Sequence, residues 1–305
     1  MTLFPHHVPD AAIDGNHEKQ HAAKTSVLAA FALVAMKVIV GLMTGSLGIL
    51  AEAAHSALDM VAAVVTWFAV HASAKPADRE HRYGHGKVEN LSALFETVLL
   101  LITCGWIGHE AIKRIISGKV DVEVTFWSFA VMGISIVVDI SRSRMLHQAA
   151  KKYNSQALEA DALHFSTDIW SSAVVNLGLL CVGLSGVVPN GDWLHYADAV
   201  AALIVGVIVI QISWKLGMRT VAGLLDAAPA GVEEKVIAAA EKVPGVFNCH
   251  HVRVRSSGPE VFIDLHVLVD GHMSLQAAHD LTESIEKAVK AVCPDADVTV
   301  HPEPK

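Results

Sequence analysis

Six long apolar segments in the first three-quarters of the chain restrict most strongly what this sequence can fold into. The length of each segment is close to the roughly 20 residues that a helix needs to cross the hydrocarbon of a bilayer. Almost none of the segments has the polar face of a soluble helix. Hydrophobic residues make up 52% of the chain and charged residues 18%, whereas soluble domains are about 25% charged. We therefore predict an all-α membrane bundle of six transmembrane helices. The predicted spans are 25–43, 47–70, 91–112, 124–141, 159–186 and 197–222.

Basic residues are divided unequally between the two sides of these spans, with twelve on one side and three on the other. Cytoplasmic flanks are enriched in Lys and Arg, so we expect both termini and the loops 71–90 and 142–158 to face the cytoplasm, with the protein in the inner membrane. On this reading 1–24 is a cytoplasmic tail and 25–225 the transmembrane domain. The twelve are Lys19, Lys24, Lys75, Arg79, Arg82, Lys87, Arg142, Arg144, Lys151, Lys152, Lys215 and Arg219, and the three are Lys113, Arg114 and Lys119.

Residues 226–305 have a different character, with seven basic and thirteen acidic residues. Val261, Ile263, Leu265 and Val267 alternate with polar residues, which predicts a strand with one buried face. The order of elements is α-β-β-α-β, so we expect a cytoplasmic α+β domain, ferredoxin- or metallochaperone-like, with its helices on one sheet face. The predicted helices are 232–243 and 274–292; the predicted strands are 250–255, 261–269 and 297–301, the last stopped by Pro302.

Histidine is unusually frequent: there are 18, as many as Phe, Trp and Tyr together. Two of them form identical patterns with aspartate in predicted spans, His55 with Asp59 and His164 with Asp168. A spacing of four places both side chains of a pair on one helix face. Ionisable groups inside a membrane are costly, so they face the bundle interior and need partners. We predict that the two pairs meet, although each pair could instead hydrogen-bond within its own helix.

Two imidazoles and two carboxylates fit a tetrahedral divalent ion, and this nitrogen–oxygen set suits Zn²⁺ better than Mg²⁺ or Ca²⁺. Ligation requires ionised carboxylates and neutral imidazoles, so binding of the ion expels protons. Histidine titrates near pH 6.5 when unperturbed, within the range needed for such an exchange. We therefore expect a carrier that exchanges cytoplasmic Zn²⁺ for external H⁺ across the bilayer.

Two further groups of possible ligands lie outside the spans. Asp78, His81 and His85 occur within eight residues of the loop that precedes the third span, beside glycines that let the loop fold around an ion. A charged, solvated loop is the alternative. In the tail, histidines fall on both central strands, the second helix and the last strand: His250, His266, His279 and His301, with Glu303 two residues further. Solvated histidines are the alternative there, and alternation points the adjacent His250 and His251 to opposite faces.

Other function classes fit less well. The formal net charge of −8 disfavours nucleic acid as a partner. The four cysteines form no CxxC pair, which argues against a disulfide scaffold and a zinc ribbon. An intramembrane metalloprotease would need an HExxH helix, which the chain lacks, so we expect no enzymatic activity. A membrane-anchored metal sensor or buffer protein without transport is the alternative to the carrier.

Three charged residues within the spans have open interpretations. Glu52 lies near the face of His55 and could relay protons or hydrogen-bond within the bundle. Lys37 either extends its amine toward the interface or has a polar partner. Asp139, near the inner end of the fourth span, is expected to be solvated.

The combination of these motifs resembles the cation diffusion facilitator family. Six spans, HxxxD in the second and fifth, the loop Asp-x-x-His-x-x-x-His-Gly-Lys and the histidine-bearing tail cover residues 24 to 303 of the chain. The resemblance implies a homodimeric divalent-metal/proton antiporter that removes zinc, and sometimes iron, cobalt or cadmium, from the cytoplasm. It implies a transport site of His55, Asp59, His164 and Asp168 and a loop site of Asp78, His81 and His85. It also implies a binuclear tail site of His250, His266, His301 and Glu303, with His279 reaching the other protomer.

Two residues depart from the family pattern. Many bacterial members have Asp where this chain has His55, and the His form resembles members that are more selective for zinc over cadmium. Glu303 replaces the usual Asp, which leaves the ligand set of the tail open. Lys87 and Asp226 match the charge interlock with which the family holds the dimer together.

Overall fold

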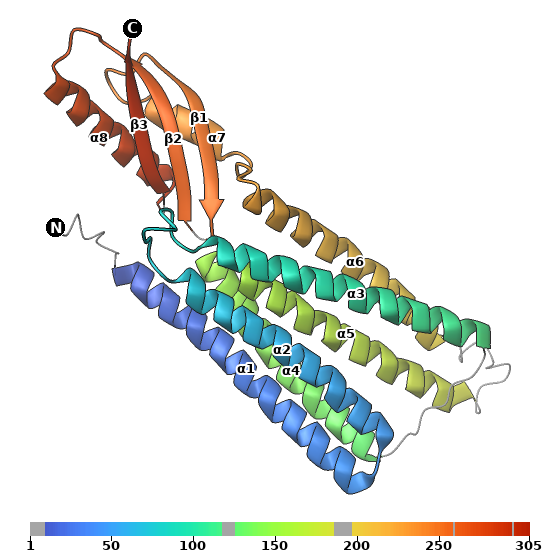
Figure 1. Ribbon diagram of the computed structural model, residues 1–305. Helices are drawn as coiled ribbons and strands as arrows, with labels where there is room; N and C mark the ends of the chain where they lie inside the picture. The colour runs from blue at the N-terminus through green and yellow to red at the C-terminus, as the bar shows by residue number, and fades with distance from the viewer. Residues whose placement is uncertain (1–9, 118–125, 186–196, 259, 295) are drawn as a thin grey trace. The chain divides into compact units, whose positions relative to one another are not determined.

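The protein, described here from a computed structural model, contains six long helices followed by a mixed α/β region (Figure 1). The described residues are 10–117, 126–185, 197–258, 260–294 and 296–305. They divide into two compact units, one from residues within 1–72 and 91–218 and the other from residues within 73–90 and 219–305. The long helices are α1 (Asp10–Thr44), α2 (Leu47–Ser73), α3 (Lys87–Ser117), α4 (Phe126–Tyr153), α5 (Gln156–Ser185) and α6 (Ala197–Leu224).

The helical unit confirms the predicted membrane bundle. Within the described residues, four helices are long and apolar enough to cross a membrane: Gly15–Thr44, Glu52–Ser73, Lys87–Trp106 and Leu203–Leu224. The helix α4 falls outside this set because Asp139, Arg142 and Arg144 interrupt its apolar sequence.

The helices of this unit extend beyond two of the predicted spans. The first helix begins at Asp10 rather than near residue 25, and Glu18 in its added turns pairs with Lys152 of α4 at 2.7 Å. The predicted loop 142–158 is helical except for a short turn, since α4 runs to Tyr153 and α5 begins at Gln156. Asn154 makes this turn in the left-handed region, with φ 49°. Arg142, predicted to flank a span, therefore lies within α4 and is buried in the helical unit.

Alanine-rich surfaces allow the helices of the bundle to approach closely. The helices α4 and α5 pack along one another, and α1 packs against α4. One buried cluster contains Leu146 and Ala150 of α4 together with Leu158 and Phe165 of α5. This packing positions the polar residues of α5 toward the interior of the unit.

The C-terminal region has the predicted α-β-β-α-β order. Its sheet has the order β1-β2-β3, in which β2 pairs antiparallel with β1 and parallel with β3. The prediction that Pro302 stops the last strand is wrong, because β3 continues to Pro304. An edge strand tolerates proline since one side of its backbone needs no ladder hydrogen bond. The elements are α7 (Val232–Ala240), β1 (Asn248–Ser257), β2 (Glu260–Val269), α8 (Leu275–Val292) and β3 (Ala296–Pro304).

The helices α7 and α8 cover the same face of this sheet. Ile263, Leu265 and Val267 of β2 are buried against Val236 of α7 and Ile285 of α8, which confirms the predicted alternation. Ser274 caps α8 as predicted, accepting a hydrogen bond from the backbone N–H of residue 277. Asp264 and His266 alternate with these buried residues and therefore lie on the opposite face of the sheet.

The segment 73–90 packs against the β1–β2 hairpin in the same unit. The ring of Tyr83 contacts Phe262 edge-on, with centroids 5.1 Å apart, and the guanidinium of Arg255 lies 3.8 Å from the Tyr83 ring centroid. Gly86 touches the hairpin so closely that an added Cβ would fall 2.1 Å from the carbonyl oxygen of Ser257. Only glycine fits at this position.

Candidate metal sites

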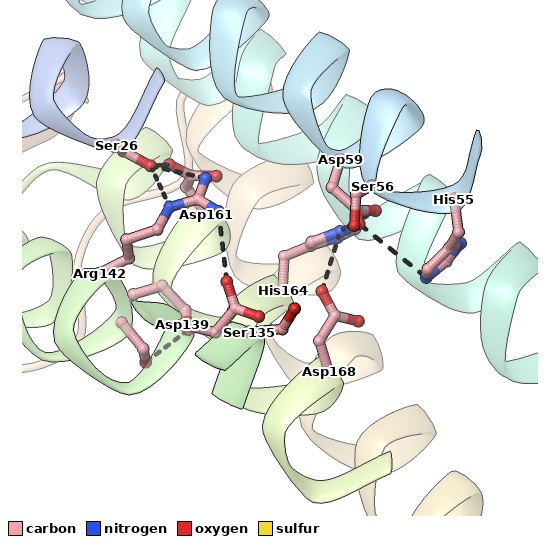
Figure 2. A network of polar contacts seen from close by, with 12 residues as sticks. Ser26, His55, Ser56, Asp59, Ser135, Asp139, Arg142, Asp161, His164 and Asp168 are labelled. Atoms are coloured by element: carbon pink, nitrogen blue, oxygen red, sulfur yellow. Dashed lines mark hydrogen bonds and ion pairs between the residues drawn. The ribbon is translucent and has the colours of Figure 1, made fainter. Parts of the chain in front are cut away.

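Asp59 of α2 meets His164 and Asp168 of α5 inside the helical unit (Figure 2). Nε2 of His164 lies 3.2 Å from Oδ1 of Asp59 and 3.7 Å from Oδ2 of Asp168. One ligand atom from each of the three residues lies within 4.8 Å of the others. The structure therefore brings together three of the four residues predicted for the transport site.

The fourth residue, His55, lies at the edge of this group. Its Nε2 is 4.0 Å from Oδ2 of Asp59, one turn away on α2, and its side chain is 37% exposed. The side chain of His164 is only 6% exposed. His55 is not one of the three residues whose ligand atoms gather here, so its place in the site stays a prediction.

A second polar network lies beside this group and involves α1, α4 and α5 (Figure 2). The buried guanidinium of Arg142 donates to Oγ of Ser26 at 3.1 Å and to Oδ1 of Asp139 at 3.3 Å. Oγ of Ser26 also donates to Asp161 at 3.4 Å, and the guanidinium lies 3.5 Å above the ring of Phe165. Asp139 is thus largely buried and paired, and the expectation that it is solvated is wrong.

Lys37 has the polar partner that its depth required. Its amine donates to Glu52 at 3.0 Å and to Ser56 at 2.8 Å, and Lys37 is buried. Hence Glu52 hydrogen-bonds within the bundle. Arg142, Asp161 and Ser26 are interior residues that the sequence patterns did not predict; the available signal was an aspartate three residues before His164.

The loop residues Asp78, His81 and His85 also lie together. Oδ2 of Asp78 is 3.5 Å from Nε2 of His85, and Oδ1 is 3.5 Å from Nδ1 of His81. The backbone N–H groups of His81 and Glu80 donate to Oδ1 of Asp78 at 2.7 and 2.9 Å. These hydrogen bonds, chiefly that of His81, hold the pKa of Asp78 below its usual range, so this carboxylate is ready to bind a cation.

The geometry of this loop suits an ion with some positions left open. The three ligand atoms lie within 4.8 Å of one another. The side chain of His85 is 15% exposed, and its buried Nδ1 has no hydrogen-bond partner among the described residues. Asp78 and His81 are more than half exposed. A metal ion held here would therefore remain in contact with solvent.

In the tail, Glu303 is surrounded by three predicted histidines. Its Oε1 is 2.9 Å from Nδ1 of His266 and 3.8 Å from Nε2 of His301, and its Oε2 is 3.2 Å from Nε2 of His250. The register aligns His250, His266 and His301 across neighbouring strands. The hydrogen bond from His266 is the main cause that lowers the pKa of Glu303. Glutamate thus reaches all three imidazoles, and a carboxylate flanked by imidazoles is a Zn²⁺-type donor set.

His251 lies on this histidine face as well. The register of β1 against β2 shifts between His250 and Arg253, and His251 adopts φ 50°. The rings of His251 and His266 lie 5.4 Å apart. The alternation that pointed His250 and His251 to opposite faces therefore fails, because a β-bulge interrupts it. His279 lies apart on α8, 62% exposed and 3.6 Å from Glu283.

Lys87 and Asp226, predicted as a charge interlock of the dimer, form an ion pair within the unit that contains both residues. Nζ of Lys87 lies 2.9 Å from Oδ1 of Asp226 and 3.4 Å from the carbonyl oxygen of Leu224. Oδ2 of Asp226 is 3.9 Å from the guanidinium of Arg255. Since the side chains of the pair are 36% and 44% exposed, this pair by itself stabilises the fold by no more than about 1 kcal/mol.

Comparison with known proteins agrees with this architecture. Residues 23–225 match the family described as the cation efflux transmembrane domain, and residues 228–305 match the cytoplasmic domain of cation efflux proteins. The chain is 31% identical over 284 residues to the cation-efflux pump FieF of Shewanella oneidensis, covering 93% of each chain. It is 30% identical over 291 residues to FieF of Yersinia enterocolitica, covering 94% of this chain and 92% of the relative.

Among solved structures, a nickel form of the MamM CTD is 27% identical, covering 25% of this chain and 99% of that chain with a TM-score of 0.24. The chain belongs to the cation efflux family, the cation diffusion facilitators that its motifs resemble. It is a multi-pass membrane protein of divalent cation efflux, and the relatives above are named as pumps rather than enzymes.

Proposed function

We propose that this protein exports Zn²⁺ from the cytoplasm in exchange for protons, by alternating access as a homodimer. The observation that carries the proposal is the meeting of Asp59, His164 and Asp168 within a single group of ligand atoms. The inner membrane, with both termini in the cytoplasm, is the location that the distribution of basic residues supports.

Protons and metal would compete for the same atoms of this group. Nε2 of His164 faces one oxygen of Asp59 and one of Asp168. An unprotonated nitrogen would repel both oxygens, so this arrangement is favourable when a proton on Nε2 lies between them. A divalent ion that takes the position of this proton binds the same three atoms. Arrival of the metal from the cytoplasm therefore releases protons, and protonation from the other side releases the metal.

The ligand types favour Zn²⁺ among the possible ions. Imidazole nitrogen with carboxylate oxygen suits Zn²⁺, whereas Mg²⁺ and Ca²⁺ prefer oxygen alone. If His55 completes the site, its nitrogen in place of a carboxylate would disfavour larger ions such as Cd²⁺. Co²⁺ and Fe²⁺ accept similar ligands and are the alternative substrates.

Flux into liposomes tests these statements. We expect Zn²⁺ uptake that depends on the pH gradient, loss of uptake in Asp168→Ala, and increased Cd²⁺ transport relative to Zn²⁺ in His55→Asp. Asp297→Ala, an exposed aspartate of β3, is the matched control and should transport normally. Uptake that ignores the pH gradient would exclude proton exchange. Metal binding without any flux would favour the alternative function, a membrane-anchored sensor or buffer.

The loop and tail groups are proposed to hold resident ions that join the two protomers. His250, His266, His301 and Glu303 would form the tail site, completed by His279 of the second protomer, while the Lys87–Asp226 pair anchors the segment 73–90. Distances between spin labels in the reconstituted dimer should change when these ions are removed by chelation. Unchanged distances would contradict the regulatory role while leaving transport intact.

A further inference from the structure

Glu96 is a buried acidic residue that the ligand group does not include. It lies in α3 with no exposed surface. Its Oε1 accepts a hydrogen bond from the hydroxyl of Thr66 in α2. Among the described residues, its buried Oε2 has no hydrogen-bond partner. An ionised carboxylate buried with one hydroxyl donor is unfavourable, so such a group either has a cation nearby or carries a proton.

The neighbouring charged groups give Glu96 no cation of its own. The charged groups that act on it most are Asp161 and His164, both in α5. Asp161 has the same sign as an ionised Glu96. The two buried cations described near the ligand group are engaged elsewhere, since Lys37 bonds Glu52 and Arg142 bonds Asp139. Glu96 thus depends for positive charge on His164, which is itself one of the three grouped ligands.

The position of Glu96 relates it to one end of the bundle. Its partner Thr66 lies seven residues beyond Asp59 along α2, about 10 Å at 1.5 Å per residue. Asp161 precedes His164 by three residues on α5, about 4.5 Å toward the same end. With the orientation expected from the basic residues, this end faces the cytoplasm.

We propose that Glu96 is a proton-carrying residue coupled to the transport site. It holds a proton on its carboxyl group while the site is free of metal. When a divalent ion binds at Asp59, His164 and Asp168, its charge stabilises the carboxylate, and the O–H bond of Glu96 breaks and its proton passes to cytoplasmic water. After the metal has left to the external side, the carboxylate takes its next proton from that side, so that one proton has crossed in exchange for the metal. The inference rests on the proposed exchange of metal for protons and assigns one of those protons.

Counting protons released per metal bound tests this assignment on the full-length protein in detergent. Zn²⁺ is added to weakly buffered protein containing a pH indicator, and the count is repeated across pH. Glu96→Gln keeps the size of the side chain and the hydrogen bond from Thr66 but cannot ionise. We expect it to bind Zn²⁺ while releasing about one proton fewer per ion than wild type, and its affinity should depend less steeply on pH.

Glu89→Gln is the matched control. Glu89 is a second fully buried glutamate on α3, two turns away, and accepts a hydrogen bond from Ser73 at 2.9 Å. This variant should release as many protons as wild type. An infrared difference spectrum upon Zn²⁺ binding gives a second readout: loss of a protonated-carboxyl band should be seen in wild type and be missing in Glu96→Gln.

The outcomes separate this inference from the proposed function. If wild type releases protons and Glu96→Gln releases the same number, Glu96 is not the carrier, although the exchange stands. If wild type releases none, the proposed exchange itself fails. If Glu96→Gln does not fold, Thr66→Val is the substitute, because it removes the hydrogen-bond donor and leaves the carboxyl group of Glu96 in place. The assignment would be overturned if Zn²⁺ binding left the protonated-carboxyl band unchanged in both wild type and Thr66→Val.

Discussion

Replacing Arg142 by methionine should destabilise the helical unit substantially. Arg142 is 4% exposed, and its guanidinium bonds Ser26 and Asp139 and lies over Phe165. Methionine fills similar volume but leaves Asp139 buried without its cation. Breaking a buried pair from one side costs about 3–5 kcal/mol in soluble proteins. We expect a value near the lower limit, about 3 kcal/mol, because helices unfolded in a micelle also find polar partners.

A double-mutant cycle measured by equilibrium unfolding in mixed micelles tests the origin of this loss. Asp139→Asn removes the second charge, so Arg142→Met combined with Asp139→Asn should be less destabilised than the sum of the single variants. The expected coupling is about 0.6–1.7 kcal/mol, the range of polar pairs within membranes. Arg144→Met, an exposed position on the same helix, should change stability by less than about 0.5 kcal/mol. Equal effects at residues 142 and 144, or strict additivity, would refute the reasoning.

Two further predictions concern the unit formed by 73–90 and 219–305. Gly86→Ala should destabilise the contact between the loop and the hairpin by about 1–3 kcal/mol, because its Cβ would meet the backbone carbonyl of Ser257 at 2.1 Å. Protease cleavage within 73–90 should therefore accelerate. Gly105→Ala, which has no atom near its Cβ position, should leave the cleavage rate unchanged. Burial, and secondarily the charge of Glu241, raise the pKa of Cys249 to about 11. Maleimide at pH 8 should therefore label the half-buried Cys293 but not Cys249. The thiol of the unfolded chain ionises at about pH 8.5. The contribution of Cys249 to stability is therefore present below that pH and declines as pH rises toward 11. Equal labelling of both thiols would contradict this.

The fold was predictable because its signals are local. The length and apolarity of the six segments indicated the bundle, and alternation in Val261–Val269 identified the central strand of the tail. A spacing of four predicted that His164 lies beside Asp168, and Nε2 of His164 is 3.7 Å from Oδ2 of Asp168 in the structure. The ends of the helices were less predictable. The polar N-terminal turns of α1 form an ion pair with α4, and no local sequence pattern contains such a tertiary contact.

The candidate sites show where local patterns stop being informative. Arg142 was predicted to flank a span because basic residues normally mark the ends of spans, whereas its burial beside Asp139 and its hydrogen bond to Ser26 come from the packing of α4 against neighbouring helices. His251 joins the histidine face only through a β-bulge. Glu96 has no motif; its burial and its single donor make it notable.

The sequence by itself determined the class of the protein, the two helices that carry the ligand pairs and the chemical types of the ligands. These follow from hydrophobicity and from side-chain periodicity along one element, which are properties of residues close in the chain. Tertiary structure alone decided that Asp59 lies 3.2 Å from His164, 105 residues away, that His55 stands at the margin, and which buried charges have partners. Such facts depend on how separate helices pack, because a contact between distant segments is selected by the combined shape and polarity of many side chains and not by either segment alone.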